Sequence, residues 1–251
     1  MDRYERLTRD LEALGGVKQS IGVSALGREL WMVRFGEGPL KLLMTGALHG
    51  REWVASDLLQ EAIVRLSQDY PYRRLSLTIV PMVNPDGVVA AQSQADRPHK
   101  ERQKSNARGV DLNRNFDSDW GTVGVDPEPD YRDANYPGAE AFSEPETRSL
   151  RDLISESGPQ YVIDWHARGG LIDGFGPRGE ELARVMAGAN GYGLVRNMHY
   201  PLSGTLSQWV RQRDPEVSAV NVEIKSEEEP DLEANVRAIR AALEWLEGLE
   251  S

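Results

Sequence analysis

Short apolar runs alternate with helix-like patterns along the whole chain, and this alternation limits the fold more than any other feature. Short runs rich in Val, Ile and Leu are typical of buried strands, whereas apolar residues three or four positions apart are typical of amphipathic helices. Strands that alternate with helices form a mostly parallel sheet covered by helices. We therefore expect one α/β domain over residues 1–251, with a mixed, mostly parallel sheet of about eight strands between helices.

The expected elements follow from their spacing and from the residues that bound them. The expected strands cover residues 20–23, 30–35, 40–46, 75–83, 161–165 and 217–224. The expected helices cover residues 4–14, 53–68, 143–157, 180–189 and 231–249. Ser143 and Glu146 have the spacing of a capping box at the start of one of these helices. Residues 86–142 show no pattern, and a segment of this kind inside a domain is usually functional.

The composition excludes several kinds of chemistry and several kinds of partner. The chain has no cysteine and four histidines, so metal chemistry depends on His, Asp and Glu, and disulfides and a Cys nucleophile are excluded. Forty acidic residues against 29 basic ones give a formal net charge of −11, which repels nucleic acid phosphates and anionic membranes. We expect neither of these partners. The oligomeric state does not follow from the sequence.

The N-terminal residues 1–16 carry dispersed charges and lack the apolar centre of a signal peptide. No later stretch approaches the roughly 18 uninterrupted apolar residues of a membrane helix. We therefore expect a soluble, cytoplasmic protein.

Three residues with metal-binding side chains lie at the ends of expected strands. His49 and Glu52 follow the strand at 40–46, and His166 follows the strand at 161–165. The carboxyl ends of neighbouring strands converge on one crevice in an open sheet, so the three side chains could meet there and leave a position for water on a zinc ion. The alternative is a first-turn Glu that complements the helix dipole and a structural His. Spacing alone leaves both interpretations open.

The segment GVDLNRNF at residues 109–116 resembles the zinc metallocarboxypeptidase family, the carboxypeptidase A-like peptidases. The other segments that resemble the family, in its order, are residues 21–28, 49–52, 84–87, 136–138 and 142–146, the strand before His166, and residues 222–223. Eight motifs in register over nearly the whole chain make a chance resemblance negligible.

The resemblance implies a carboxypeptidase-like fold and one zinc ion per chain, held by His49, Glu52 and His166. It also implies that Glu223 is the catalytic carboxylate. Zinc lowers the pKa of its water to about 7, and a nearby Glu can take the proton and later deliver it to the leaving amine. Without the family context, Glu223 would be interpreted as a solvated residue at the end of a strand.

Other matching residues point to the substrate. Asn113 and Arg114 match the pair that holds the substrate's terminal carboxylate, and a planar guanidinium suits bidentate recognition of that group. Tyr200 matches the family's mobile tyrosine, and the neighbouring His199 is expected to be structural or exposed. The resemblance thus implies hydrolysis of an amide bond beside the free carboxylate of a small peptide.

The family's Trp-Arg-Lys motif, which supplies the arginine that stabilises the oxyanion, is missing from this chain. The matching residues 101–108 read ERQKSNAR, and Lys104, Arg102 and Arg51 are alternative cations. We favour Lys104 because residues 104–113 resemble the bacterial branch that cuts γ-D-glutamyl-diaminopimelate bonds.

Residues 204–209 resemble the murein peptide amidases of the same branch. Ser207 stands at the position that helps to set side-chain specificity in the digestive enzymes, and its small hydroxyl fits neither basic nor aromatic side chains. Asp173 could accept the distal ammonium of diaminopimelate, and Arg168 could meet its second carboxylate. Exposed loop charges are the alternative interpretation of both residues.

These observations favour a cytosolic murein-peptide amidase. A general bacterial metallocarboxypeptidase is the first alternative, because the two enzymes differ only in the pocket. A catalytically silent peptide-binding protein on the same fold is the second, although such a protein does not need three metal ligands together with Glu223.

Overall fold

The computed structural model describes residues 1–14, 18–98, 102–122, 135–195 and 203–249. Within these ranges one mixed sheet of eight strands, in the order β1-β2-β4-β3-β5-β8-β6-β7, runs through the molecule. Its strands are β1 (Lys18–Val23), β2 (Glu29–Phe35), β3 (Leu40–Gly46), β4 (Leu75–Val80), β5 (Tyr161–Ala167), β6 (Leu171–Phe175), β7 (Gly193–Val195) and β8 (Ser218–Ile224). The expected fold class is confirmed.

The centre of the sheet is parallel and its flanks are partly antiparallel. β4, β3, β5 and β8 are parallel neighbours, whereas β1 and β2 form an antiparallel hairpin and β2 pairs antiparallel with β4. On the other side, β6 is antiparallel to β8 and parallel to β7. The carboxyl ends of β3, β5 and β8 therefore meet at one edge of the sheet.

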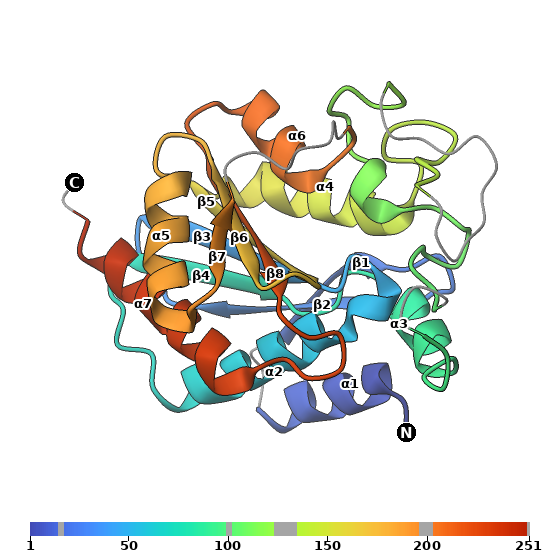
Figure 1. The fold of residues 1–251 in the computed structure, drawn as a ribbon, viewed down its shortest axis with the longest axis horizontal. Helices are drawn as coiled ribbons and strands as arrows, with labels where there is room; N and C mark the ends of the chain where they lie inside the picture. The colour runs from blue at the N-terminus through green and yellow to red at the C-terminus, as the bar shows by residue number, and fades with distance from the viewer. Residues whose placement is uncertain (15–17, 99–101, 123–134, 196–202, 250–251) are drawn as a thin grey trace.

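Helices cover both faces of the sheet (Figure 1). One face carries α1 (Arg3–Ala13), α2 (Trp53–Gln68), α5 (Gly179–Asn190) and α7 (Leu232–Glu247), and the other carries α4 (Pro145–Ser157) and α6 (Leu206–Arg213). In the described ranges no helix combines the length and the apolar character that crossing a membrane requires.

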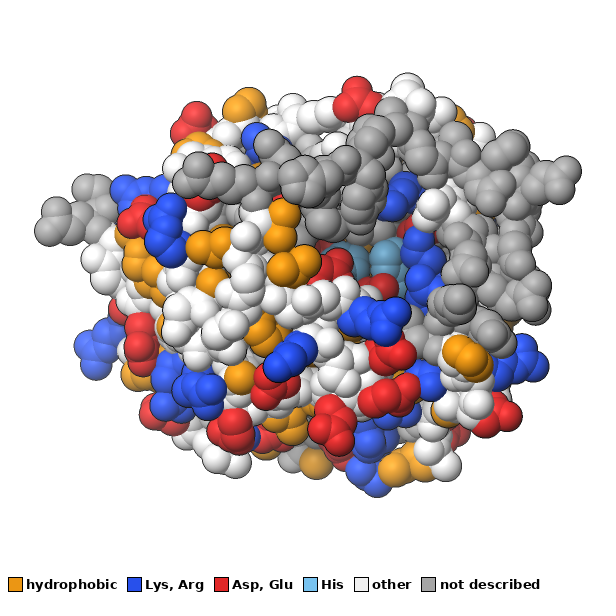
Figure 2. Space-filling view, in the orientation of Figure 1, with side chains coloured by type: hydrophobic (Ala, Val, Ile, Leu, Met, Phe, Trp, Pro, Cys, Tyr) orange, Lys and Arg blue, Asp and Glu red, His pale blue; other side chains and the backbone are white. Residues whose placement is uncertain are grey.

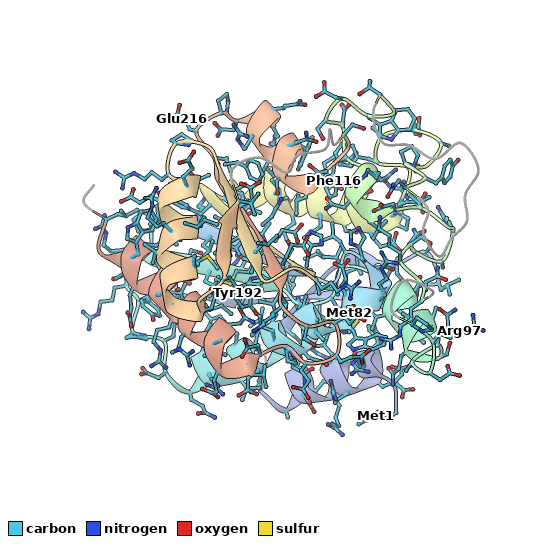
Figure 3. All side chains as sticks on the ribbon, viewed as in Figure 1. Met1, Met82, Arg97, Phe116, Tyr192 and Glu216 are labelled. Atoms are coloured by element: carbon cyan, nitrogen blue, oxygen red, sulfur yellow. The ribbon has the colours of Figure 1, made fainter. Side chains whose placement is uncertain are left out.

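Each face of the sheet has its own hydrophobic core, because successive side chains of a strand point to opposite faces. In β5, Ile163 packs into the core under α2, α5 and α7, whereas Val162 packs into the core under α4 and α6. Phe116, labelled beside α6 in Figure 3, belongs to the second core and has its ring 5.8 Å from that of Trp209. The central strands are thus buried on both sides, and their ends are held rigidly.

The sequence patterns missed several short elements. α3 (Pro85–Gln92) and the 3₁₀ turn η3 (Leu112–Arg114) lie in the segment expected to lack structure, and β6, β7 and α6 were also not expected. α3 has only eight residues, too few for a helical period to be recognised. Its start is set by Pro85 in the first turn and by Asn84, whose Oδ1 accepts from Gly87 N at 2.9 Å.

The capping box expected at Ser143 and Glu146 is not formed. Glu144 is the N-cap of α4, and no side chain caps this helix. The fully buried Glu146 carboxylate instead accepts hydrogen bonds from Ala25 N at 2.9 Å and from Asn106 Nδ2 at 3.2 Å. Glu146 therefore joins α4 to two distant loops, a role that local spacing cannot indicate.

Candidate metal centre and active site

His49, Glu52 and His166 meet where β3 and β5 end. Their ligand atoms all lie within 4.8 Å of one another. Nδ1 of His49 is 2.8 Å from Glu52 Oε1, and Nδ1 of His166 is 3.0 Å from Glu52 Oε2. Figure 2 shows histidine side chains on the floor of a hollow that acidic and basic side chains border. The cluster is therefore buried but open to the surface on one side.

The backbone around His49 is held by a close contact with α3. Gly50 begins the 3₁₀ turn η1 (Gly50–Glu52), and a Cβ at this position would lie 2.3 Å from the backbone of Gly87. Asn84 Nδ2 donates to Leu48 O at 3.0 Å on the other side of His49. Only glycine allows this approach, which fixes the direction of both the His49 and the Glu52 side chains.

His49 is oriented by a buried carboxylate. Its Nε2 lies 3.1 Å from Asp111 Oδ1. The other oxygen of Asp111 accepts from Lys104 Nζ at 2.6 Å, and the same ammonium donates to Asn135 Oδ1 at 2.8 Å. Burial works to raise the pKa of Asp111, but the attraction of Lys104 and His49 outweighs it and lowers this pKa well below its usual value.

His166 is oriented by a different buried carboxylate. Its Nε2 lies 2.8 Å from Asp164 Oδ2, and Asp164 Oδ1 accepts from Thr45 Oγ1 at 2.7 Å. Burial opposes protonation of His166, but Asp164 and Glu52 raise its pKa well above the usual value. Burial works to raise the pKa of Glu52, but the imidazoles of His49 and His166 outweigh this effect and lower it.

This donor set fits zinc. Two imidazole nitrogens and one carboxylate oxygen are the ligands of many catalytic zinc sites, which keep a further position open. In such sites the second nitrogen of each histidine donates to a carboxylate or a carbonyl, as Asp111 and Asp164 allow here. Neither carboxylate was singled out from the sequence, although Asp164 precedes His166 by two residues and therefore shares its face of the strand.

Glu223 lies beside the cluster on the neighbouring strand. It is the register partner of His166 across the parallel pair β5 and β8. Burial raises the pKa of the Glu223 carboxyl to about 7, and Glu52 adds to this rise, whereas His166 and His49 oppose it. The structure thus brings the predicted catalytic carboxylate together with all three predicted ligands.

Asn113 and Arg114 lie next to the cluster in η3. Asn113 Oδ1 accepts from Leu206 N at 3.0 Å, and its Nδ2 is 3.4 Å from His166 Nε2. Arg114 Nη1 donates to Asn113 O at 2.6 Å, while its buried Nε has no hydrogen-bond partner in the part of the chain that the structure describes. A buried cationic N–H that has no hydrogen-bond partner is suited to bind an anionic group.

Ser207 and Asp173 are brought together through Asn221, which the sequence reasoning missed. Ser207 Oγ donates to Asn221 Oδ1, and Asn221 of β8 is the register partner of the buried Asp173 of β6. Directly paired residues place their side chains on the same face of a sheet, which is also the face of Glu223, two residues further along β8. Because side chains alternate between the two faces of a strand, the position of Asn221 two residues before Glu223 could have indicated that both lie on the face of the site.

The remaining candidate cations are placed differently. Arg102 donates to the backbone oxygens of Arg97 and Ala95, both at 3.0 Å, and pairs with Glu228 at 2.7 Å. Its guanidinium therefore holds loops together, so the structure does not support it as the oxyanion partner.

Arg168, on the loop after β5, has a side chain that is 64% exposed and pairs with Glu227 at 3.1 Å. Arg51 lies in η1 between two ligand residues, while Tyr200 and His199 lie outside the described residues. The geometry therefore leaves Lys104 and Arg51 as the candidate oxyanion cations.

Comparison with known proteins identifies the family. The zinc carboxypeptidase model, Peptidase_M14, matches residues 17–175. The chain belongs to this family. The membership agrees with the resemblance inferred from the motifs, and it accounts for the position of the cluster at the carboxyl ends of central strands.

Individual relatives include both carboxypeptidases and wall-peptide enzymes. Carboxypeptidase B of Helicoverpa zea is 33% identical over 125 residues, 46% of this chain and 29% of that protein. Gamma-D-glutamyl-L-diamino acid endopeptidase 1 of Lysinibacillus sphaericus is 28% identical over 182 residues, 61% of this chain and 46% of that protein. The chain spans about half the length, or less, of the curated relatives that it matches first.

One solved structure is matched over nearly its full length. The murein-tripeptide amidase MpaA of Escherichia coli O157 has a TM-score of 0.68 and 25% identity, with coverage of 95% of this chain and 96% of that one. The family fold thus extends over nearly the whole chain.

Proposed function

We propose that this chain is a zinc-dependent hydrolase that cleaves an amide bond next to a free carboxylate. The observation that carries the proposal is the meeting of His49, Glu52 and His166 within 4.8 Å, with Glu223 as the register partner of His166. An ion-binding cluster and a separate, half-buried carboxylate beside it are the two parts that metal-assisted hydrolysis requires.

One zinc ion per chain would be held by His49, Glu52 and His166. When bound, zinc supplies a Lewis acid that acidifies water and polarises a carbonyl group. Glu223 accepts the proton of the attacking water and returns it to the nitrogen of the leaving amine, which is general base and then general acid catalysis by one side chain.

Asn113 and Arg114 bind the free carboxylate of the substrate in this proposal. The unpartnered Nε of Arg114 gains a charge-assisted hydrogen bond when that carboxylate binds. Because both residues lie in η3 next to His166, a carboxylate held there places the preceding amide bond at the metal cluster. This position selects a bond next to a chain end.

Lys104 is our candidate for stabilising the oxyanion. Its ammonium has three N–H donors, of which two are used by Asp111 and Asn135. The third can donate to an oxygen that gains negative charge during attack. Arg51 is the alternative cation, because it stands between His49 and Glu52 in the chain.

For the substrate, we propose a γ-D-glutamyl-diaminopimelate peptide from murein. Two observations support it: the similarity to the murein-tripeptide amidase over nearly the full length of both chains, and the polar cluster of Ser207, Asn221 and the buried Asp173. A carboxylate such as Asp173 can accept the distal ammonium of diaminopimelate. Arg168 lies on the loop between β5 and β6 and is our candidate partner for the distal carboxylate.

The same polar cluster supports a second candidate, a carboxypeptidase that removes C-terminal lysine or arginine from ordinary peptides. A buried Asp173 also suits these side chains, and the chain resembles a carboxypeptidase B. The two candidates differ in whether the enzyme requires the γ-linked D-glutamyl residue and the second carboxylate.

The deciding experiment compares substrates with the zinc-loaded protein. We expect the γ-D-glutamyl-diaminopimelate tripeptide to be cleaved faster than α-linked peptides ending in Phe, Leu, Arg or Lys. Replacing diaminopimelate by an aliphatic residue should cost about 1.5–3 kcal/mol in kcat/KM, because the charged contact of its distal ammonium is lost. Replacement by lysine, which keeps the ammonium, should cost less.

Each contrary result has its own meaning. Faster cleavage of the α-linked peptides would replace the amidase with a general carboxypeptidase. A protein that binds zinc and peptides but has no turnover on either substrate class would be a silent peptide-binding protein.

A further inference from the structure

A row of polar residues crosses the sheet at the level of Asp164, two residues before His166 on β5. Thr45 of β3 pairs with Asp164 of β5, Asp164 pairs with Asn221 of β8, and Asn221 pairs with Asp173 of β6. The adjacent row consists of Met44, Ile163 and Val220, all fully buried. An ionisable group in the middle of a central parallel strand is unusual, because such strands are normally apolar throughout.

Asp164 makes a specific set of contacts. Its side chain is only 1% exposed, and each of its oxygens has one partner: Thr45 Oγ1 at 2.7 Å and His166 Nε2 at 2.8 Å. No lysine or arginine among the described residues lies within 4.0 Å of it, whereas Asp111, the partner of His49, has Lys104 at 2.6 Å. Burying a carboxylate without a lysine or arginine partner costs free energy, so this residue needs a reason beyond packing.

The geometry assigns the proton of the His166 ring. Asp164 Oδ2 can only accept from Nε2, and the single hydrogen of a neutral imidazole must then be on Nε2. Asn113 agrees with this assignment, because its Oδ1 accepts from Leu206 N and its Nδ2 therefore faces Nε2, at the long distance of 3.4 Å. Two N–H groups that face each other do not bond. In the neutral ring that metal binding requires, Nδ1 of His166 therefore offers its lone pair to the cluster formed with His49 and Glu52.

We propose that Asp164, itself held by Thr45, is a positioning residue that keeps His166 in the tautomer and orientation required for metal binding and strengthens metal retention through its negative charge, which no lysine or arginine of the described residues neutralises. The inference rests on the metal site of the proposed function. Thr45 keeps the Asp164 carboxylate turned toward His166, because the hydroxyl can donate only to Oδ1 while the ring takes Oδ2.

The test measures zinc affinity rather than turnover. The zinc dissociation constants of the wild type, Asp164→Asn, Thr45→Val and Thr45→Ser are measured by competition with a chromogenic chelator. We expect Asp164→Asn to bind zinc about 10–100-fold more weakly, the effect typical of groups that orient metal ligands. Thr45→Val, which keeps the shape and removes the hydroxyl, should weaken binding less, and Thr45→Ser should bind like the wild type.

A second readout follows the ring itself. Long-range ¹H–¹⁵N spectra of the zinc-loaded protein with labelled histidine should show a protonated Nε2 for His166 in the wild type and in Thr45→Ser. In Asp164→Asn we expect this proton to exchange faster with solvent and its resonance to shift upfield. Circular dichroism of each variant shows whether it is folded.

The outcomes separate this inference from the proposed function. If the folded Asp164→Asn protein binds zinc within about twofold of the wild type, the inference is overturned and the metal site stands. If Asp164→Asn does not fold, the zinc dissociation constant of Thr45→Val is compared with that of Thr45→Ser. Equal constants for these two variants then overturn the inference. A wild type that binds no zinc overturns both the inference and the proposed function.

Discussion

The proposed site has a half that would hold the metal and a half that would face the substrate, and the two halves are built differently. In the metal half (His49, Glu52, His166, Asp111 and Asp164), both nitrogens of each ring and both oxygens of each carboxylate have partners within the protein. The substrate half consists of Asn113, Arg114, Ser207, Asn221 and Asp173. Within it, Arg114 Nε has no hydrogen-bond partner in the described part of the chain. The side chains of the first half are therefore held in place by one another, whereas the second half keeps a donor for the ligand.

The two halves also differ in what holds them. The proposed metal ligands His49 and His166 lie at or next to the ends of central strands, and a close glycine contact at Gly50 fixes the turn between His49 and Glu52. The substrate half depends on contacts between loops. A Cβ on Gly204 would lie 2.1 Å from Arg114 O, and Phe116 N donates to Gly204 O at 3.0 Å. Substitutions in the two halves should therefore affect different measurable quantities.

The largest effect is expected from the ligands. His49→Ala and His166→Ala should each lose zinc during dialysis, and their activity should fall by more than the ~10²–10⁴-fold typical of losing a general base, because the Lewis acid is lost. Metal analysis by atomic absorption checks this. Stoichiometric zinc in the same site of either variant would show that the ligand assignment is wrong.

Glu223→Gln should separate chemistry from binding. The amide cannot take the proton of the attacking water, so kcat should fall by about 10²–10⁴-fold. Zinc content and KM should stay close to the wild type, since Glu223 is not a ligand in our assignment. Steady-state kinetics with metal analysis test this, and a kcat near that of the wild type would remove Glu223 from the mechanism.

Lys104 lies on the boundary between the halves. If its third N–H stabilises the oxyanion, Lys104→Met should lower kcat by about 10²–10³-fold and retain zinc. The variant should also be less stable to heat, because Asp111 loses a buried partner. Unchanged kcat with a lowered Tm would assign Lys104 to structure alone, and Arg51→Met would then be the next variant to measure.

Arg114→Ala tests the substrate half alone. The loss of one charge-assisted contact should lower kcat/KM by about 10–150-fold, equivalent to about 1.5–3 kcal/mol. Amidating the free carboxylate of the substrate should have a similar effect on the wild type and little further effect on the variant. An enzyme indifferent to this amidation would not use a free carboxylate for binding.

The smallest effect is expected outside the site, at Glu146. Burial raises the pKa of this carboxyl, and its hydrogen bonds with Ala25 and Asn106 only partly oppose the rise. The folded protein thus binds the proton more tightly than the unfolded chain, so wild-type stability should be lost as pH rises from the unfolded pKa through the raised folded one. Glu146→Gln does not titrate, so the difference in its favour should grow over this pH range and then level off.

Urea unfolding of the wild type and Glu146→Gln at several pH values measures this difference. The zinc dissociation constant and kcat should be the same in both proteins, which makes Glu146 a control for buried carboxylates that serve the fold alone. A pH-independent difference in stability would contradict the raised pKa.

The metal half was largely predictable from the sequence. His49, Glu52 and His166 follow apolar runs that are long enough to be recognised as strands, and parallel strands bring their carboxyl ends together in any fold of this class. Asp164 escaped prediction because it interrupts such a run, and the pattern of its neighbours indicated only a buried strand.

The substrate half was less predictable. Ser207 was singled out by its position, but its contact with Asn221 joins α6 to β8, and α6 itself was not expected. Arg102 was considered as an oxyanion cation, yet the structure uses it to hold the loop at 95–97 against Glu228. Nothing local to a long arginine side chain indicates which of several distant acceptors it will reach.

The sequence by itself determined the α/β class, the strand ends that carry the metal ligands, and the motifs that mark the family, because periodicity and short motifs are local properties of the chain. Only the tertiary structure decided which carboxylate orients each histidine, where the ammonium of Lys104 is bound, and that Ser207, Asn221 and Asp173 share one face. The bonds of Thr45 with Asp164 and of Ser207 with Asn221, which join residues 119 and 14 positions apart, depend on strand order and register, and these are set by the packing of the whole sheet.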